Sequence, residues 1–429
     1  MNNNNKRTIV RTAAIILVAF FPAAVLAQTH WVSTWGTALV ERAQVVATPE
    51  DRAPAANNAP RRPFGGPPLA IDDQTLRQII HTSIGGDSAR IVLSNIYGTA
   101  PLNVGAASMA LTDEGTEDKA DIRAQSSKAI TFNGKTTATV ALGAVLLSDP
   151  IDFKVPALTN VAIDLYFPDS AAEAGSPLTV HQFASQNNYV SDKGNHAGKG
   201  QFPAKSSNGG WHYLARLEVT APAKAGTIVA FGDSITDGTR STTDTNQRWP
   251  DFLARRLQAA NIPLGVVNAG IAGNQVLGDG AGRSALARFD KDALMQTGVT
   301  HIVVLESIND IGLARANPTP SAEDLIAGHQ QLIARAHARG LLIYGATLTP
   351  FDGASYFSPE GEAKRQAVNE WIRSSGAYDG IVDFDAAVRD PKNPSKLLPQ
   401  YNPGDNLHMN DAGYEAMANA IDLKLFKPE

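Results

Sequence analysis

Two short motifs, far apart in the sequence, carry side chains that acyl transfer requires. Gly232-Asp233-Ser234 offers a hydroxyl in a turn-rich segment, and Asp405-x-x-His408 offers a carboxylate and an imidazole. A serine hydroxyl is a weak nucleophile until a base removes its proton, and histidine has a suitable pKa for that task. A carboxylate on the other ring nitrogen would hold the imidazole in one tautomer. One turn of backbone could bring Asp405 and His408 together.

A tetrahedral intermediate also needs hydrogen-bond donors for its oxyanion, and one such donor can contribute roughly 3 kcal/mol. The candidates are the backbone N–H groups of Ser234 and Gly273 and the side-chain amide of Asn309. Each motif alone has a simpler interpretation. Gly-Asp-Ser is also a turn with a serine cap, the glycines suit ordinary turns, Asn309-Asp310 suits a helix cap, and Asp-x-x-His suits a surface pair. Their order along the chain favours one shared site.

The elements that would position these residues alternate between strand and helix. Five apolar segments are expected to be strands, at residues 228–231, 265–270, 300–306, 341–348 and 381–385, with helical patterns between them. This alternation predicts a parallel, doubly wound sheet, which binds ligands outside the carboxyl ends of its strands. The candidate residues follow the first, second, third and fifth strands.

The N-terminal half has a different pattern. Residues 71–220 contain short β-rich runs separated by turns, which predicts an antiparallel β-sandwich or jelly roll. Residues 48–68 are rich in proline and are expected to be a surface loop. A short Pro/Gly-containing link at 221–226 separates a β-rich accessory domain, 28–222, from a catalytic domain, 226–429.

Residues 1–27 have the features of a cleavable secretory signal peptide: a basic start, an apolar run and Val25-Leu26-Ala27 at the cleavage site. An uncleaved membrane anchor is the alternative, although the apolar run is short for a full span. We expect a secreted or periplasmic protein with no stable membrane association. Removing the three basic residues of this segment changes the net charge from −5 to −8, with 34 Lys and Arg against 42 Asp and Glu. An acidic protein is a poor partner for nucleic acid.

The sequence contains no cysteine, which excludes a cysteine nucleophile, cysteine-ligated zinc and iron–sulfur chemistry. A metal site formed by Asp233, Asp237, Asp310 and His408 is disfavoured, because no histidine pair with ligand spacing accompanies them. The glycine-rich turn lacks the lysine of a P-loop. We therefore expect neither a metal nor a cofactor. His329 and His337, on one predicted helix, are expected to be partly exposed.

The C-terminal half resembles the SGNH (GDSL-type) serine hydrolases. The four sequence blocks of that family match Gly232-Asp-Ser-Ile, Gly273, Asn309-Asp310 and Asp405-x-x-His408, over about residues 226–425. The resemblance implies a flavodoxin-like three-layer α/β/α fold and ester hydrolysis without a metal. It implies Ser234 as nucleophile, His408 as base and Asp405 as its orienting group. It also implies an oxyanion hole formed by Ser234, Gly273 and Asn309. Asp233 and Asp310 would support the loops.

Two positions depart from the family pattern. Ile235 replaces the usual leucine, which is conservative, and Ser307 stands where the third block usually has glycine. A side chain at 307 could narrow the site or move Asn309. The Gly-x-Ser-x-Gly elbow of ordinary α/β-hydrolases is absent around Ser234, which disfavours that fold. The whole chain looks like a secreted bacterial branch of two-domain GDSL-type esterases.

The substrate is less well defined than the reaction. Export, an acidic surface and an attached β domain suit short-chain or carbohydrate O-acyl (acetyl) esters, either as small molecules or on a polysaccharide. A lipase or lysophospholipase-type acylhydrolase is compatible with the same motifs. A non-catalytic carbohydrate-binding protein that keeps the fold is the alternative from another class. The oligomeric state is not predicted.

Overall fold

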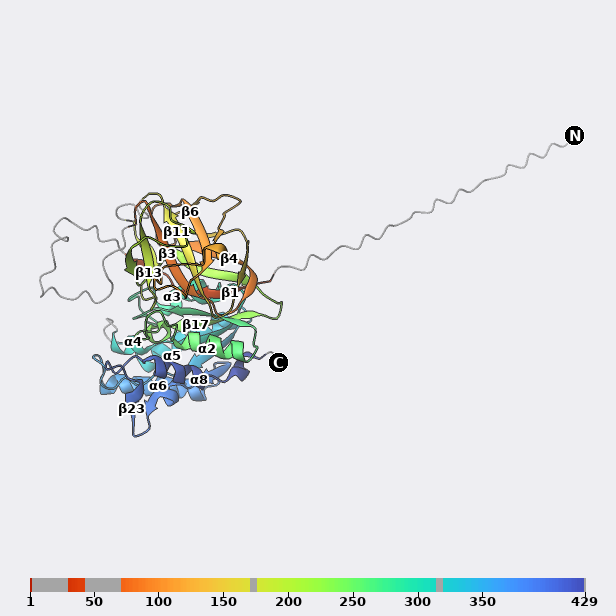
Figure 1. The fold of residues 1–429 in the computed structure, drawn as a ribbon. Helices are drawn as coiled ribbons and strands as arrows, with labels where there is room; N and C mark the ends of the chain where they lie inside the picture. Colours follow the sequence, from red (N-terminus) through yellow and green to blue (C-terminus); the bar gives the residue numbers. More distant parts are fainter. Residues whose placement is uncertain (2–29, 43–70, 170–175, 314–318, 428–429) are drawn as a thin grey trace, which may run out of the picture.

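The computed structural model describes residues 1, 30–42, 71–169, 176–313 and 319–427 (Figure 1). The predicted signal peptide, beyond its first residue, and the predicted proline-rich loop at 48–68 lie outside the described residues. The β-rich half lies against the α/β half, in the upper and lower parts of Figure 1. Among the residues described, none of the helices is long and apolar enough to cross a membrane.

The C-terminal half is built on a five-stranded, fully parallel sheet. Its spatial order is β18-β17-β19-β20-β21. The strands are β17 (Gly226–Gly232), β18 (Leu264–Gly270), β19 (Val299–Leu305), β20 (Leu342–Ala346) and β21 (Gly380–Val382). Every residue of β17 is buried, as expected for a central strand covered on both faces. The predicted α/β fold of this half is confirmed.

Helices cover both faces of this sheet. On β17, Val229 and Phe231 contribute to one hydrophobic core, whereas Ile228 and Ala230 contribute to another. The first core includes α3 (Ala285–Phe289), α5 (Ala322–His337) and α6 (Pro359–Ser374). The second includes α2 (Trp249–Ala259), α7 (Phe384–Val388) and α8 (Asp411–Ala420). The last helix, α8, ends at Ala420, because Ile421 is extended and a separate 3-10 turn follows at Leu423–Phe426.

The N-terminal half consists of antiparallel sheets, as the turn-separated runs predict. One sheet has the order β1-β16-β4-β10, with β9 also on β4, and the other has the order β14-β13-β3-β11-β6-β7. The first contains β1 (Trp31–Gly36), β4 (Gly86–Ser94), β9 (Val145–Leu147), β10 (Ile151–Val155) and β16 (Leu214–Thr220). The second contains β3 (Gln74–His81), β6 (Ala106–Leu111), β7 (Lys128–Ala129), β11 (Asn160–Phe167), β13 (Asn188–Lys193) and β14 (Ala204–Asn208). Both sheets contribute side chains to one hydrophobic core.

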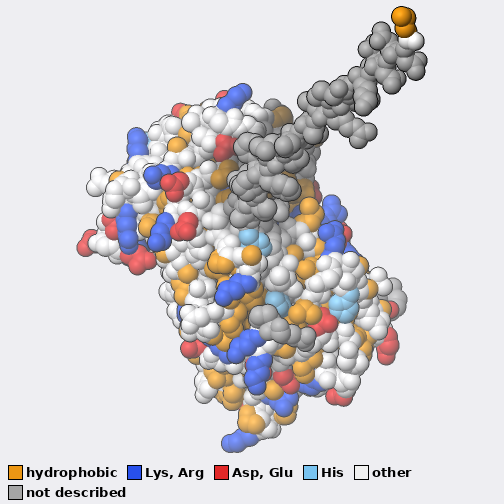
Figure 2. Space-filling view, turned by 90° about the vertical axis from the view of Figure 1, so that its right-hand side faces the viewer, with side chains coloured by type: hydrophobic (Ala, Val, Ile, Leu, Met, Phe, Trp, Pro, Cys, Tyr) orange, Lys and Arg blue, Asp and Glu red, His pale blue; other side chains and the backbone are white. Residues whose placement is uncertain are grey.

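Smaller strands complete the molecule. β2 (Val40–Arg42), β12 (Leu178–His181) and β15 (Trp211–His212) form a three-stranded sheet. The two-stranded pairs are β5 (Leu102–Val104) with β8 (Ala138–Val140) and β22 (Arg389–Asp390) with β23 (Asn393–Leu397). On the face drawn in Figure 2, acidic and basic side chains are interspersed and hydrophobic ones lie in small patches.

The two halves share a close-packed boundary. Ala38 and Val40 belong to the same hydrophobic core as Phe231 of the parallel sheet. The backbone N–H of Ser33 in β1 donates to the hydroxyl of Thr227 in β17, at 3.1 Å. A side chain at Gly265 would meet the Ser33 carbonyl at 2.3 Å, so the backbones approach where only glycine fits. The N-terminal half is therefore positioned against strands that lead to the candidate site.

Candidate active site

Ser234 is presented at the carboxyl end of the central strand. It is the first residue of the short helix α1 (Ser234–Asp237), and the side chain of Asp233 caps this helix by accepting from the N–H of Ile235. A Cβ at Gly232 would lie 2.2 Å from Thr236 Oγ1 and 2.5 Å from the Leu305 carbonyl. The glycine thus allows the sharp turn that carries the chain from strand to helix.

His408 joins the predicted nucleophile to the predicted carboxylate. Its Nε2 lies 2.8 Å from Ser234 Oγ, and its Nδ1 lies 3.0 Å from Asp405 Oδ2. Asp405 and His408 lie in the loop before α8, so they reach the serine from the far end of the chain. The two nitrogens of one imidazole therefore contact a hydroxyl and a carboxylate, which is the geometry needed for base catalysis.

Asp405 is held by four hydrogen bonds. Oδ1 accepts the backbone N–H groups of Leu407 and His408, at 3.1 and 3.0 Å. Oδ2 accepts Arg240 Nε at 3.0 Å in addition to the imidazole. Although partial burial acts in the opposite direction, these hydrogen bonds hold the pKa of Asp405 well below its usual range. The carboxylate is therefore ionised throughout the neutral range.

The predicted oxyanion donors come from the loops after three neighbouring strands. Gly273, after β18, has φ of +79°, a value that favours glycine. Asn309 lies in α4 (Ile308–Gly312), after β19, and its Nδ2 donates to the carbonyl of Asn274 at 2.9 Å. An amide nitrogen carries two hydrogens, so this bond uses only one of them. The structure thus links Asn309 directly to the residue that follows Gly273.

A buried arginine that belongs to none of the sequence motifs connects these loops. Arg288 in α3 donates to the carbonyls of Gly232 and Ala269, at 2.9 and 2.8 Å. It also donates to Asn274 Oδ1 at 2.7 Å and pairs with Glu306 at 3.1 Å. One guanidinium therefore fixes the ends of β17 and β18 and the glycine turn together.

Three buried carboxyl groups, on Asp233, Glu306 and Asp310, interact electrostatically with one another in this region. Burial raises the pKa values of Asp233, Glu306 and Asp310, the last to about 6. Asp310 accepts the backbone N–H groups of Val276 and Leu277, at 2.7 and 3.0 Å. Asp233 and Asp310 thus hydrogen-bond loop backbone. Among the described residues, Glu306 Oε2 is buried without a hydrogen-bond partner.

A cavity of about 160 Å³ lies beside the glycine turn, at the boundary between the two halves. Its walls come from both halves and comprise Val40, Glu41, Arg42, His181, Gln182, Phe183, Asp237, Ile271, Ala272 and Ala281. Asp237 connects the two sides, because it accepts His181 Nε2 at 3.0 Å and the N–H of Ala272 at 3.1 Å. Burial opposes protonation of His181, but the charge and hydrogen bond of Asp237 prevail and raise its pKa.

Two further histidines behave differently from one another. His329 is fully buried, so the expectation that it is partly exposed is wrong. Its position four residues after the apolar Leu325, on the same face of α5, is the feature of the sequence that indicates burial. His337 is 44% exposed and pairs with Asp379, at 3.0 Å. Within the described ranges, no group of three or more His, Asp or Glu side chains could hold a metal ion.

Comparison with known proteins identifies the class to which this site belongs. The family model of the GDSL-like lipase/acylhydrolase family matches residues 230–416. Esterase TesA of Pseudomonas aeruginosa is 33% identical over 202 residues, 44% of this chain and 94% of that protein. The chain therefore belongs to the GDSL-like lipase/acylhydrolase family, as the four sequence blocks predict, and it is a carboxylic ester hydrolase.

Solved structures align with nearly half of the chain. A catalytic mutant of an acetylxylan esterase from Geobacillus stearothermophilus aligns with a TM-score of 0.37 and 22% identity, covering 48% of this chain and 95% of that chain. A carbohydrate acetylesterase family member from Sinorhizobium meliloti aligns with a TM-score of 0.37 and 16% identity, over 46% and 94% of the respective chains.

Proposed function

We propose that this hydrolase is a secreted serine esterase in which Ser234, His408 and Asp405 form the catalytic triad. The observation that carries the proposal is the position of His408, within hydrogen-bond distance of Ser234 Oγ on one side and Asp405 Oδ2 on the other. The basic and apolar segments of residues 1–27, followed by small residues, support export of the mature chain.

In the proposed reaction, His408 Nε2 takes the proton of Ser234 as Oγ attacks the ester carbonyl. The oxyanion accepts hydrogen bonds from the N–H groups of Ser234 and Gly273 and from the amide of Asn309. The C–O bond then breaks, and the imidazolium gives its proton to the leaving alkoxide. Water, deprotonated by the same imidazole, attacks the acyl-enzyme and releases the acid and the free serine.

The proposed substrates are short-chain or carbohydrate O-acyl esters, such as acetyl esters. We place the acyl group in the cavity lined by Ala272; at about 160 Å³ this cavity is smaller than the roughly 300–1,000 Å³ of sites for drug-sized ligands, which favours a short acyl group. The small side chains of Ala272 and Ala281 provide an apolar wall. Glu41, Arg42 and Gln182 add polar groups suited to a hydroxylated alcohol. A panel of acetylated sugars and of p-nitrophenyl esters with increasing acyl length tests this specificity.

The mechanism is tested by Ser234→Ala. We expect this variant to lose p-nitrophenyl acetate turnover and labelling by a fluorophosphonate probe, while its thermal unfolding temperature stays close to that of the parent. His408→Ala should lose turnover in the same way. Full activity in Ser234→Ala, or labelling at a different serine, would refute the assignment of the nucleophile.

A further inference from the structure

Ser307 has a backbone conformation that residues with a side chain rarely adopt. It directly precedes α4, and its φ of 106° lies in the left-handed region. The residue is completely buried. Glycine adopts this conformation without the steric cost of a Cβ, and such strain persists only where the surroundings impose it.

The side chain that holds Ser307 is His329 in α5. The Ser307 hydroxyl lies 2.9 Å from His329 Nε2, and His329 Nδ1 lies 2.5 Å from the hydroxyl of Tyr378. The imidazole packs edge-on against the Tyr378 ring, with centroids 6.1 Å apart. Burial lowers the pKa of His329 to about 4, so the ring is neutral near pH 7. A neutral imidazole offers one donor and one acceptor, which suits a hydroxyl on each side.

The conformation of Ser307 sets the direction of the short helix that carries Asn309. The carbonyl of Ser307 accepts the N–H of Ile311 at 3.2 Å, which forms the first turn of α4. Asn309 lies within that turn and donates to Asn274. A change of backbone angle at Ser307 would therefore move the amide away from the turn that contains Gly273.

We propose that His329 is a positioning residue for ester hydrolysis: by holding the Ser307 hydroxyl, it keeps the start of α4 in the left-handed conformation that aims the Asn309 amide at the oxyanion. This inference rests on the proposed role of Asn309. The hydrogen bond between Ser307 and His329 stabilises a backbone conformation that a glycine would adopt at this position without such a bond.

The test compares Ser307→Ala, Ser307→Gly and His329→Leu with the parent, using p-nitrophenyl acetate. Alanine keeps the Cβ but loses the hydroxyl, so kcat should fall roughly tenfold or more, with KM changed less than about threefold. Glycine loses the hydroxyl and the strain together, so kcat should stay within about twofold. His329→Leu should resemble Ser307→Ala. In the double variant Ser307→Gly/His329→Leu, kcat should differ by less than about threefold from that of Ser307→Gly alone.

Controls separate this inference from simple core packing and from the proposed function. His337→Leu makes the same substitution at an exposed position of α5, outside the hydrogen-bond chain, and should leave kcat within about twofold. Fluorophosphonate titration counts active serines, and thermal unfolding reports stability. Equal kcat values for Ser307→Ala and Ser307→Gly, or an undiminished His329→Leu effect in the glycine background, would overturn the positioning role. Unchanged kcat in Asn309→Ala would instead refute the proposed oxyanion hole, and with it the reason for the positioning.

Discussion

At the scale of single residues, two hydrogen-bond donors share one oxygen of Asp405. His408 Nδ1 and Arg240 Nε both donate to Oδ2, but Arg240 is 58% exposed, whereas the His408 side chain is only 14% exposed. Solvent screening weakens the exposed pair. The imidazole bond therefore bears on the reaction more directly than the arginine does.

We predict that Asp405→Asn lowers kcat by roughly 10³- to 10⁴-fold, because an amide at this position can hold the imidazole in the wrong tautomer. Arg240→Gln is the matched control. It should change kcat by less than about fivefold, since the carboxylate keeps its bonds to His408 and to two backbone N–H groups. Steady-state kinetics on a short ester measure both. Similar losses in the two variants would show that Arg240 is equally important.

The motifs predicted the contacts of the candidate triad because each motif carries a reactive side chain at short spacing. The residues that brace the site were harder to predict. Arg288 contacts Gly232 and Ala269 at the ends of β17 and β18, and Asn274 and Glu306 in the loops after β18 and β19, so no local pattern reveals the contacts. Ser307 was visible as a departure from the family pattern, but its partner in α5 depends on how that helix packs.

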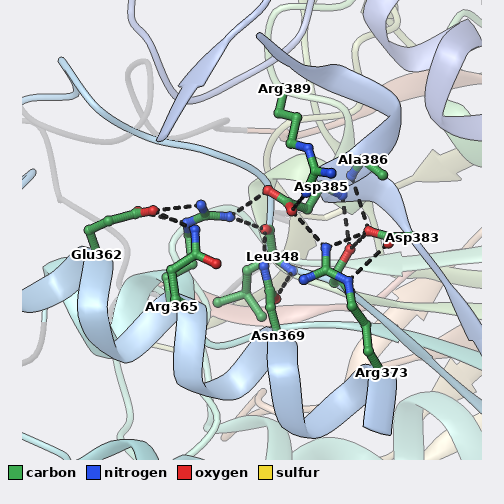
Figure 3. A network of polar contacts seen from close by, with 11 residues as sticks. Leu348, Glu362, Arg365, Asn369, Arg373, Asp383, Asp385, Ala386 and Arg389 are labelled. Carbon is green, nitrogen blue, oxygen red and sulfur yellow. Dashed lines mark hydrogen bonds and ion pairs between the residues drawn. The ribbon is translucent and has the colours of Figure 1, made fainter. Parts of the chain in front are cut away.

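At the scale of elements, α6 holds the segments that follow β20 and β21 of the parallel sheet. Figure 3 shows Glu362, Arg365, Asn369 and Arg373 along this helix, facing Asp383, Asp385 and Arg389. Asp385 is buried and accepts from three arginines: Arg365 and Arg373 at 2.7 Å, and Arg389 at 2.9 Å. Asn369 also holds both the N–H of Leu348, at 2.7 Å, and its carbonyl, at 2.9 Å.

We predict that Asp385→Ala destabilises the protein by about 3–5 kcal/mol, because removal of the carboxylate leaves buried arginine charge without its partner. Glu360→Gln, in the same helix, removes the charge of a carboxylate that is 80% exposed in its pair with Lys364, and should change stability very little. Urea unfolding of both variants measures the difference. A small effect of Asp385→Ala would mean that Glu362 and Asp383 compensate for the lost carboxylate.

The alternation of strands and helices in the C-terminal half was predictable, since buried parallel strands form continuous apolar runs. The arrangement of the N-terminal sheets was not. β1 pairs with β16, near the opposite end of that half, and β3 lies between β11 and β13. Such pairings depend on tertiary packing and leave no periodic signal in either strand.

At the scale of the whole molecule, the buried carboxyl groups make stability depend on pH. The folded protein retains protons on Asp233, Glu306 and Asp310 at pH values where the unfolded chain has released them. The contribution of these carboxyl groups to the free energy of unfolding is therefore most favourable below about pH 4. It declines as the pH rises through the pKa values that the groups have in the folded protein. Asp405 acts in the opposite direction, but only at pH values below its ordinary pKa.

We predict that Glu306→Gln raises the melting temperature at pH 8 more than it does at pH 5.5. An amide cannot ionise, so it avoids the cost of a buried carboxylate. Glu415→Gln, at an exposed position of α8, is the control and should leave the pH dependence unchanged. Calorimetry at the two pH values tests the prediction. An identical pH dependence in parent and Glu306→Gln would contradict it.

The pairing of β1 with β16 also has a consequence for the order of events during synthesis. The strand Trp31–Gly36 is among the first parts to leave the ribosome, but its sheet partner is Leu214–Thr220. At about 5–20 residues per second, it waits roughly 10–40 s for that partner. Ser33 then needs Thr227 and the carbonyl of Thr297, which are made later still. The strand Trp31–Gly36 therefore packs only after Thr297 has been made, so the boundary between the two halves closes only after most of the chain has been translated.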